Sequence, residues 1–399
     1  MMNKAGLIEG FENGIVARFI GKDRDTRCVK TENRDKTWAG YYGKYNELAR
    51  IFLKKCCSEN KNRNLVLSPL SILMVLSMLA GATDGKTREE ILSFIGDDCS
   101  YEDIKEIAQS LSVLNNDSRE LYSANAVCIN EKISNSIRKE YIDELKEIYS
   151  GEFFSASDMV KAVNSWVEKK TNGMIEKIID DSDAEMLAGI INAIAFESEW
   201  FDPYEESQIW DEEFTDIDRK KKRVPMLHST EEKYIENKSL TGFIKDYKGC
   251  NYSFMGLLPR KGGASQIRRC IKDIDFTETF CSAELCDVEV TMPEFSYKSE
   301  LDLSDYCEKM GIRTAFTAEA DFSPLSSEWL KVDKLLHSAR IEFDRCGTKA
   351  AAATIAVACA GCALVFCEQK RVKLDRPFIF AIMHNETKLP IFVGVVNHI

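Results

Sequence analysis

The segment 347–358 is the feature that most restricts how this chain can fold. It reads Gly-Thr-Lys-Ala-Ala-Ala-Ala-Thr-Ile-Ala-Val-Ala, and an alanine run taken alone favours a helix. In an extended strand, by contrast, alternate residues face opposite sides. One side of such a strand carries only small residues, which are Thr348, Ala350, Ala352, Thr354, Ala356 and Ala358. We interpret the segment as a strand that can slide between two existing strands, with its small residues facing a filled core.

The opposite side of this strand carries the charged residue and the larger ones. Lys349, Ile355 and Val357 share that side, and a helical period gives no reason for this grouping. A strand inserted between two existing strands needs small residues inward and tolerates varied residues outward. This parity favours the strand interpretation over the helix.

The rest of the chain has helices in its first half and strands in its second. Helices are expected over 45–55, over 68–79 with Ser68 as N-cap and Pro69 in the first turn, and over 162–179 with an interruption at 171–173. Strands are expected over 189–196, 287–292, 340–344, 377–382 and 391–396. The predicted class is α+β with mostly antiparallel sheets. Residues 38–399 form one domain, and 1–37 form a polar extension that is expected to be partly disordered.

Composition narrows the partners and the compartment. The net charge of −12 argues against a nucleic-acid partner, which needs a basic surface. No apolar run reaches the roughly 20 residues of a membrane span, so we expect no membrane association. Most of the 14 cysteines sit singly in apolar segments, and charged residues interrupt 1–22 where a signal peptide would be apolar. A reducing, cytoplasmic location is therefore expected, with non-classical export left open.

Several segments, in order along the chain, resemble the serpin family. The stretch 347–354 is similar to the hinge of the serpin reactive loop, usually G-T-E-A-A-A-A-T, and 375–380 resembles the segment that follows the loop. Further matches, with near-family spacing, are 64–72, 163–175, 191–196, 224–226, 310–322 and 392–397. The resemblance covers nearly the whole chain from about residue 40. It implies helices packed on three mostly antiparallel β-sheets, with an exposed reactive loop at about 345–376.

The resemblance also implies a mechanism, which starts from a native state with a gap available in the main sheet. A serine protease cuts the loop and forms its acyl intermediate, and the freed hinge then inserts into the main sheet and distorts the attached enzyme. The expected partner is the target protease, held as a covalent acyl complex by a monomeric inhibitor. No enzymatic activity, cofactor or metal is expected. The alternative is a non-inhibitory serpin that acts as a carrier, chaperone or storage protein.

The matching motifs assign roles to particular residues. The hinge residues are Gly347, Thr348, Ala350, Ala352 and Thr354. The polar cluster beneath the point where the sheet opens, called the shutter below, comprises Ser68, Ser71, Asn192 and His337. Non-inhibitory serpins typically carry charge, bulk or proline on inward hinge positions, and this hinge has none.

Two positions at the loop base depart from the family pattern together. The family commonly has glutamate two residues before the hinge glycine, paired with a lysine that follows the motif V-x-L-P. Here these positions are Arg345 and Glu294. We predict an Arg345–Glu294 ion pair at the top of the sheet. Such a surface pair contributes only about 0–1 kcal/mol, so its use would be to position the hinge.

The bond that a protease would cut has two candidates. Counting from the hinge gives Gly361-Cys362, and counting back from Pro377 gives Phe366-Cys367. The window 359–366 contains no Lys, Arg or Asp, which favours an elastase- or subtilisin-like target, with a chymotrypsin-like target possible at Phe366. Cys359 and Cys362 either form a reversible loop disulfide or are simply small, tolerated residues.

Overall fold

Helices dominate the first half of the chain and strands the second, as the sequence predicts. The computed structural model describes residues 35–60, 62–96, 99–117, 120–348 and 369–399. Its α-helices are α1 (Asp35–Glu59), α2 (Pro69–Ala82), α3 (Gly85–Ile95), α4 (Tyr101–Asp117), α5 (Lys139–Tyr149), α6 (Met159–Lys170), α7 (Ala264–Asp273), α8 (Phe276–Cys281) and α9 (Ser304–Met310). Residues 1–34 of the predicted extension lie outside the described residues, and α1 already begins at Asp35.

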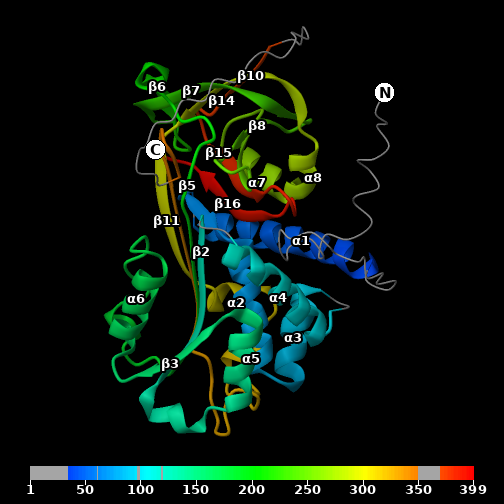
Figure 1. Ribbon diagram of the computed structural model, residues 1–399, viewed down its shortest axis with the longest axis vertical. Helices are drawn as coiled ribbons and strands as arrows, with labels where there is room; N and C mark the ends of the chain where they lie inside the picture. The colour runs from blue at the N-terminus through cyan, green and yellow to red at the C-terminus, as the bar shows by residue number, and fades with distance from the viewer. Residues whose placement is uncertain (1–34, 61, 97–98, 118–119, 349–368) are drawn as a thin grey trace, which may run out of the picture.

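A seven-stranded sheet forms one layer of the molecule. Its strand order is β3-β2-β4-β12-β13-β5, and β11 pairs with β12. These strands are β2 (Leu121–Asn130), β3 (Glu152–Ala156), β4 (Ala188–Phe196), β5 (Ser198–Glu199), β11 (Phe295–Asp302), β12 (Lys334–Phe343) and β13 (Gly347–Thr348). Figure 1 shows this sheet nearly edge-on, with α6 on one side and α2 to α5 on the other.

The second sheet has nine strands in the order β1-β16-β15-β9-β8-β7-β10-β14, and β6 pairs with β7. They are β1 (Leu65–Leu67), β6 (Ile209–Thr215), β7 (Lys221–Glu236), β8 (Leu240–Asp246), β9 (Tyr252–Pro259), β10 (Glu284–Pro293), β14 (Lys370–Lys373), β15 (Phe378–His384) and β16 (Pro390–Val396). The prediction of three sheets is thus corrected to two hydrogen-bonded sheets in the described chain. The cause is the 16-residue strand β7, whose first part pairs with β6 and whose last residues pair with β8.

Antiparallel pairing predominates, as expected. The described exceptions are three parallel pairs, β2 with β3, β4 with β12, and β10 with β14. The parallel β4–β12 pair matters most for function, because the candidate site begins where these two strands separate.

Helix α2 forms the centre of the core. Every residue from Pro69 to Ala82 is buried, since a helix that is apolar on all sides must be enclosed. The Ser68 side chain caps it by accepting a hydrogen bond from the Ser71 N–H, as the sequence predicts. The helix packs on β4 and β12 of one sheet and on β16 of the other. It therefore lies directly beneath the strands of the candidate site.

The predicted bounds of all three helices are wrong. The helix expected over 45–55 is α1, which spans Asp35–Glu59, and the helix expected to end at Leu79 continues to Ala82. The helix α6 ends at Lys170, and no helix resumes before residue 179. Asn172 and Gly173 have φ values of 51° and 75°, and this left-handed turn redirects the chain out of the helix.

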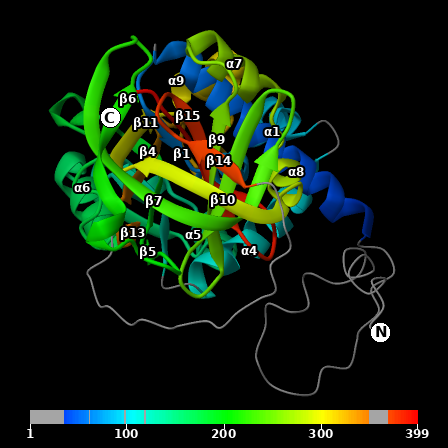
Figure 2. The same ribbon diagram turned by 90° about the horizontal axis from the view of Figure 1, so that it is seen from above.

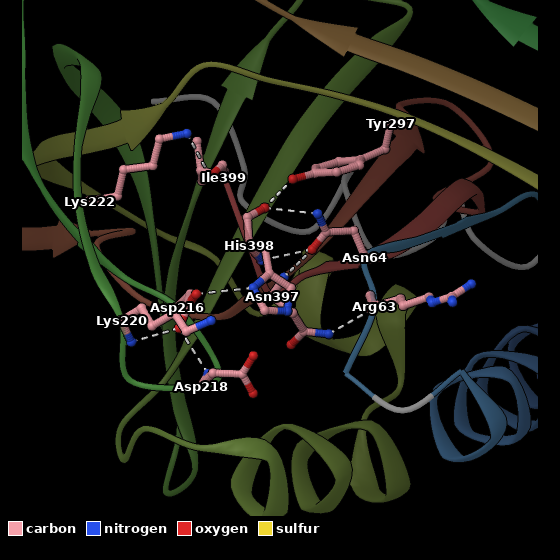
Figure 3. Close-up of polar contacts among 10 residues, drawn as sticks. All are labelled: Arg63, Asn64, Asp216, Asp218, Lys220, Lys222, Tyr297, Asn397, His398 and Ile399. Atoms are coloured by element: carbon pink, nitrogen blue, oxygen red, sulfur yellow. Dashed lines mark hydrogen bonds and ion pairs between the residues drawn. The ribbon is translucent and has the colours of Figure 1, made fainter.

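The C-terminus is held by side chains from segments that are distant in the sequence (Figure 3). Asn64 Oδ1 accepts hydrogen bonds from the backbone N–H groups of Asn397 and His398, and its Nδ2 donates to the His398 carbonyl oxygen at 2.8 Å. The Tyr297 hydroxyl donates to the same carbonyl. These contacts hold the end of the chain independently of the segment 349–368.

Candidate functional site

The site begins where β4 and β12 separate. Gly189–Ala195 of β4 pair directly with Lys334–Arg340 of β12. Beyond these residues the short strand β13 lies between β12 and β5, with Phe343 opposite Thr348 and Thr348 opposite Ser198. The sheet is therefore closed along most of β4 and occupied by the hinge at its end. The expectation of a gap available in the main sheet is corrected accordingly.

A tight turn leads into β13. Asp344 Oδ1 accepts hydrogen bonds from the N–H groups of Cys346 and Gly347 at 2.7 and 3.0 Å, and the Asp344 N–H donates to the Gly347 carbonyl at 2.9 Å. Trp200 fixes the turn from the side, because its backbone N–H donates to Cys346 O and its indole N–H donates to Asp344 O, both at 2.9 Å. The start of the loop is thus held in one conformation.

Gly347 is required by this close packing. Its φ is 151°, and an added Cβ would lie 2.2 Å from the Ser198 carbonyl oxygen. Any side chain here would push β13 away from β5. The glycine therefore lets the hinge approach the neighbouring backbone.

Thr348 faces inward, as its place on the small side of the strand predicts. It is fully buried, and its hydroxyl oxygen lies 2.8 Å from that of Tyr247. The Tyr247 ring is stacked on Trp200 with a centroid distance of 4.5 Å. The first inward residue of the hinge thus has a shaped polar and aromatic pocket.

The shutter residues lie below this point. His337 Nε2 accepts a hydrogen bond from the Ser68 N–H at 3.3 Å, and its Nδ1 lies 2.6 Å from Ser71 Oγ. Since Nε2 accepts, the neutral ring carries its hydrogen on Nδ1 and donates it to Ser71. Complete burial lowers the pKa of His337 to about 3. The ring is therefore neutral near pH 7 and acts as a structural link between β12 and α2.

Asn192 lies directly opposite His337 in the β4–β12 pair. Its Nδ2 donates to Asn125 Oδ1 at 2.7 Å and to Ser123 Oγ at 3.4 Å. Its Oδ1 is buried and has no hydrogen-bond partner among the described residues. The structure thus brings all four predicted shutter residues together and leaves one acceptor unsatisfied.

Arg345 and Glu294 are in contact, but not as the predicted ion pair. Glu294 Oε1 accepts a hydrogen bond from the backbone N–H of Arg345 at 3.2 Å. The Arg345 guanidinium instead lies 3.5 Å from Glu206. The predicted charge pairing is therefore corrected to a side chain-to-backbone bond. The turn at Asp344 presents the backbone N–H of Arg345 to Glu294, between β10 and β11, and directs the Arg345 side chain toward Glu206.

The remaining predicted site residues lie outside the described part of the chain. They are the hinge residues Ala350, Ala352 and Thr354, and the reactive-bond candidates Gly361, Cys362, Phe366 and Cys367, all within 349–368.

Several of the described cysteines are core residues. Cys128, Cys270 and Cys307 are buried, as the sequence predicts. Burial raises the pKa of Cys128 and of Cys307 to about 12, so neither thiol is activated as a nucleophile.

One group in the described part of the chain could offer metal ligands. Atoms of Asp216, Asp218 and His398 lie within 4.8 Å of one another. Asp216 Oδ1 already accepts from the N–H groups of Asp218 and Lys220, which closes the turn between β6 and β7 (Figure 3). The loop geometry accounts for this cluster, and we assign no metal to it. In the described residues no helix has the length and apolar character needed to cross a bilayer.

Three functional residues escaped the sequence reasoning. Asp344 could have been found, because Asp three residues before Gly is a turn signal. Ser198 and Tyr247 could not, because their roles depend on strand pairings between distant segments.

Comparisons with known proteins identify the family. Residues 44–399 match the family Serpin (serine protease inhibitor), and the chain belongs to it. A similar solved structure is a thermophilic serpin, tengpin, in its native state, with 31% identity, a TM-score of 0.82, and 94% of this chain and 97% of that chain covered. Curated relatives include an alpha-1-antitrypsin-like protein of Tamias sibiricus, 29% identical over 88% of this chain and 87% of its own length, and thyroxine-binding globulin of Rattus norvegicus, 28% identical over 86% and 85%. Serpins are generally protease inhibitors rather than enzymes, and these relatives include a protein named for binding thyroxine.

Proposed function

We propose that this serpin is a single-use inhibitor of serine proteases that traps its target by inserting the cut loop between β4 and β12. The observation that carries the proposal is the position of Gly347 and Thr348. These two residues already form a strand between β12 and β5, with Thr348 buried. The first step of insertion is therefore present before any cleavage.

The register of β13 determines where each following residue would lie. Thr348 pairs with both Phe343 and Ser198. In antiparallel pairing, residue numbers run in opposite directions, so each residue further along the inserted strand pairs with a residue one position earlier on each neighbouring strand. Thr354, six residues on, would therefore lie between His337 and Asn192, the two shutter residues that pair across the closed sheet.

Inward residues of the inserted strand would meet a filled core. Ala350 would lie between Ile341 and Phe196, and both of these side chains are fully buried. A methyl group fits such a site, whereas a larger side chain would overpack it. Thr354 would bring a hydroxyl group to the unsatisfied Asn192 Oδ1.

The outward side of the inserted strand is more restricted than the sequence suggested. In the same register Ile355 would lie between Leu336 and Ile191, which pack with α6 in a cluster that includes Val163. An apolar residue suits this position, because α6 covers it. Only outward residues near the β13 end of the inserted strand, such as Lys349, would lie beyond α6.

Insertion exchanges one strand pairing for two. The seven residue pairs between β4 and β12 would separate, and the new strand would pair on both sides. The net gain is one strand pairing of similar length, or roughly 4–10 kcal/mol at about 0.5–1.5 kcal/mol per hydrogen bond. Buried apolar area adds to this gain. The native fold is thus expected to be less stable than the cleaved, inserted form.

The fragment after the cut stays bound during this change. β15 pairs with both β9 and β16, and β16 also pairs with β1. The Asn64 contacts in Figure 3 fasten the last residues as well. Cleavage within 359–367 therefore releases the hinge without loss of the C-terminal strands.

The target is proposed from the loop sequence. Small apolar residues around Gly361-Cys362 fit the shallow pocket of an elastase- or subtilisin-like protease, and Phe366 fits a chymotrypsin-like one. We further propose that the inhibitor is a cytoplasmic monomer that forms a covalent acyl complex with its target.

Reaction with elastase, subtilisin and chymotrypsin tests this proposal. An SDS-stable complex is expected with one of them, and mass spectrometry of the released C-terminal fragment would identify the cut bond. Cleavage of the loop by all three enzymes without any complex would contradict inhibition. That result would favour a carrier role, the alternative suggested by the thyroxine-binding globulin relative.

A further inference from the structure

A cation-lined hollow lies where the edge strand β14 meets β8 and β9. Its volume is about 340 Å³, and its lining residues are Thr241, Leu258, Arg260, Arg371, Lys373 and Arg376. The hollow is shallow and largely open to solvent, so a ligand there would be held mainly by charge and hydrogen bonds and not by enclosure. Four of the six lining residues are cationic and none is acidic. Such a lining is unexpected in a chain whose net charge is −12.

The acidic partners of these cations lie outside the lining. Arg260 pairs with Glu236, Arg371 with Glu289, Lys373 with Glu212 and Arg376 with Asp375. The four basic side chains are between 30% and 74% exposed. Exposed ion pairs of this kind are weak, and each guanidinium has five N–H donors. A ligand can therefore bind N–H groups that the carboxylate partners do not use. It can also displace one of these carboxylates at a small cost in free energy.

We propose that this hollow binds a compact anion carrying two or more phosphate or sulfate groups. Arginine recognises such groups through paired N–H donors, and three arginines converge here from separate segments of the fold. Arg260 follows β9, Arg371 belongs to β14, and Arg376 precedes β15. Three guanidinium groups offer more paired N–H donors than the oxygen atoms of one phosphate group can accept, which favours an anion with two or three linked groups.

Binding at this position would tie β14 to the body of the molecule. β14 is the last strand of the nine-stranded sheet and pairs with β10. The two strands lie beside each other in the view from above (Figure 2). It is also the first described strand after the segment 349–368. An anion held by Arg371 and Lys373 on one side and Arg260 on the other would stabilise the native state through mass action. This site is distinct from the hinge and shutter, and its existence does not depend on inhibition.

Calorimetric titration of the full chain with sodium tripolyphosphate at constant ionic strength tests the proposal. Saturable binding at one site is expected, with hydrogen-exchange protection over 369–376. The double substitution Arg371→Gln/Lys373→Gln should weaken binding about tenfold or more, because two charge-assisted contacts are removed. Lys221→Gln is the matched control, since Lys221 is also an exposed lysine in an ion pair, with Glu213, and lies outside the hollow. Its affinity should equal that of the unchanged protein.

Other results would overturn the proposal. Heat changes that sodium sulfate reproduces at the same ionic strength would indicate charge screening alone. Equal affinity in the double variant would place the anion elsewhere, and binding only to phosphoinositide vesicles would exclude a free oligoanion as the ligand. If the double variant does not fold, Arg371→Lys keeps the charge and loses the paired donors, and it should still weaken binding severalfold.

Discussion

The hydroxyl groups of Thr348 and Tyr247 are hydrogen bonded at 2.8 Å although 101 residues separate them in the sequence. This contact fixes the inward direction of the hinge at its first strand residue. Because side chains alternate along a strand, it also fixes the direction of each inserted residue that would follow.

The substitution Thr348→Arg should convert the inhibitor into a substrate. An arginine at this buried position would place an unpaired charge beside Tyr247 and Trp200, which opposes insertion. We expect the ratio of cleaved to complexed protein to rise by about tenfold or more, since each 1.4 kcal/mol changes a rate ratio tenfold. Lys349→Arg, on the outward side, is the matched control, since it places the same side chain one residue away on the other face, and it should leave the ratio unchanged. Efficient complex formation by Thr348→Arg would refute the inward assignment.

The register argument predicts a specific effect of Thr354→Val. After insertion, the threonine hydroxyl would lie near His337 and the unsatisfied Asn192 Oδ1. Its loss should lower the unfolding free energy of the cleaved form by about 1–2 kcal/mol and leave the native form unchanged. Guanidinium unfolding of both forms measures this difference, and Thr354→Ser should restore the stability. Equal shifts in the two forms would show that residue 354 lies elsewhere after insertion.

Much of this site could be predicted from sequence, because its residues follow local rules. The alternation in 347–358 indicated a strand with a small inward face, and its first two residues form β13 with Thr348 buried, while 349–358 lie outside the described residues. Ser68 before Pro69 indicated a helix start. The buried run 189–196 was also predicted as a strand, and the structure has β4 there. Family resemblance then grouped Ser68, Ser71, Asn192 and His337, and the structure places them together.

The remaining features depend on pairings that a single sequence does not reveal. The direct β4–β12 pairing closed a sheet that was expected to have a gap. In the turn at Asp344, the backbone N–H of Arg345 donates to Glu294. The Arg345 guanidinium then lies near Glu206 and not near Glu294. Strand β7 is long enough to pair with β6 at one end and β8 at the other, and it thereby joins two sheets that were expected to be separate. No local sequence pattern marks the point where a long strand changes its pairing partner.

Acid should destabilise the native protein through His337. Burial lowers its pKa to about 3, below its usual value near 6.5. The unfolded chain therefore binds more protons than the folded one between these values, and the unfolding free energy falls as pH decreases below 6.5. His337 alone should account for a loss of about 2 kcal/mol between pH 7.5 and 5.0.

Urea unfolding at these two pH values measures the effect. His337→Gln should remove about 2 kcal/mol of the pH-dependent loss, even if it lowers stability at both pH values. His398→Gln is a histidine control at a half-exposed site and should keep the His337 contribution. An unchanged pH dependence in His337→Gln would show that this histidine is not buried and neutral.

The turn before the hinge should depend on Asp344 more than on Arg345. Asp344→Ala removes the acceptor for two backbone N–H groups and should lower the unfolding free energy by about 1–2 kcal/mol. Arg345→Ala removes only an exposed ion pair with Glu206 and should change it by less than about 0.5 kcal/mol. Thermal unfolding of the two variants compares them. A larger effect of Arg345→Ala would mean that charge, not the turn, positions the hinge.

Thermal unfolding before and after loop cleavage tests the central claim most directly. The protein would be cut with a small amount of subtilisin, and mass spectrometry would confirm a single cut within 359–367. Insertion of the hinge between β4 and β12 should raise the midpoint of unfolding by at least about 5 °C, given a gain of roughly 4–10 kcal/mol and about 1.2 °C per kcal/mol for a chain of 399 residues. An unchanged or lower midpoint in the cleaved protein would contradict insertion, and with it the proposed trapping of proteases.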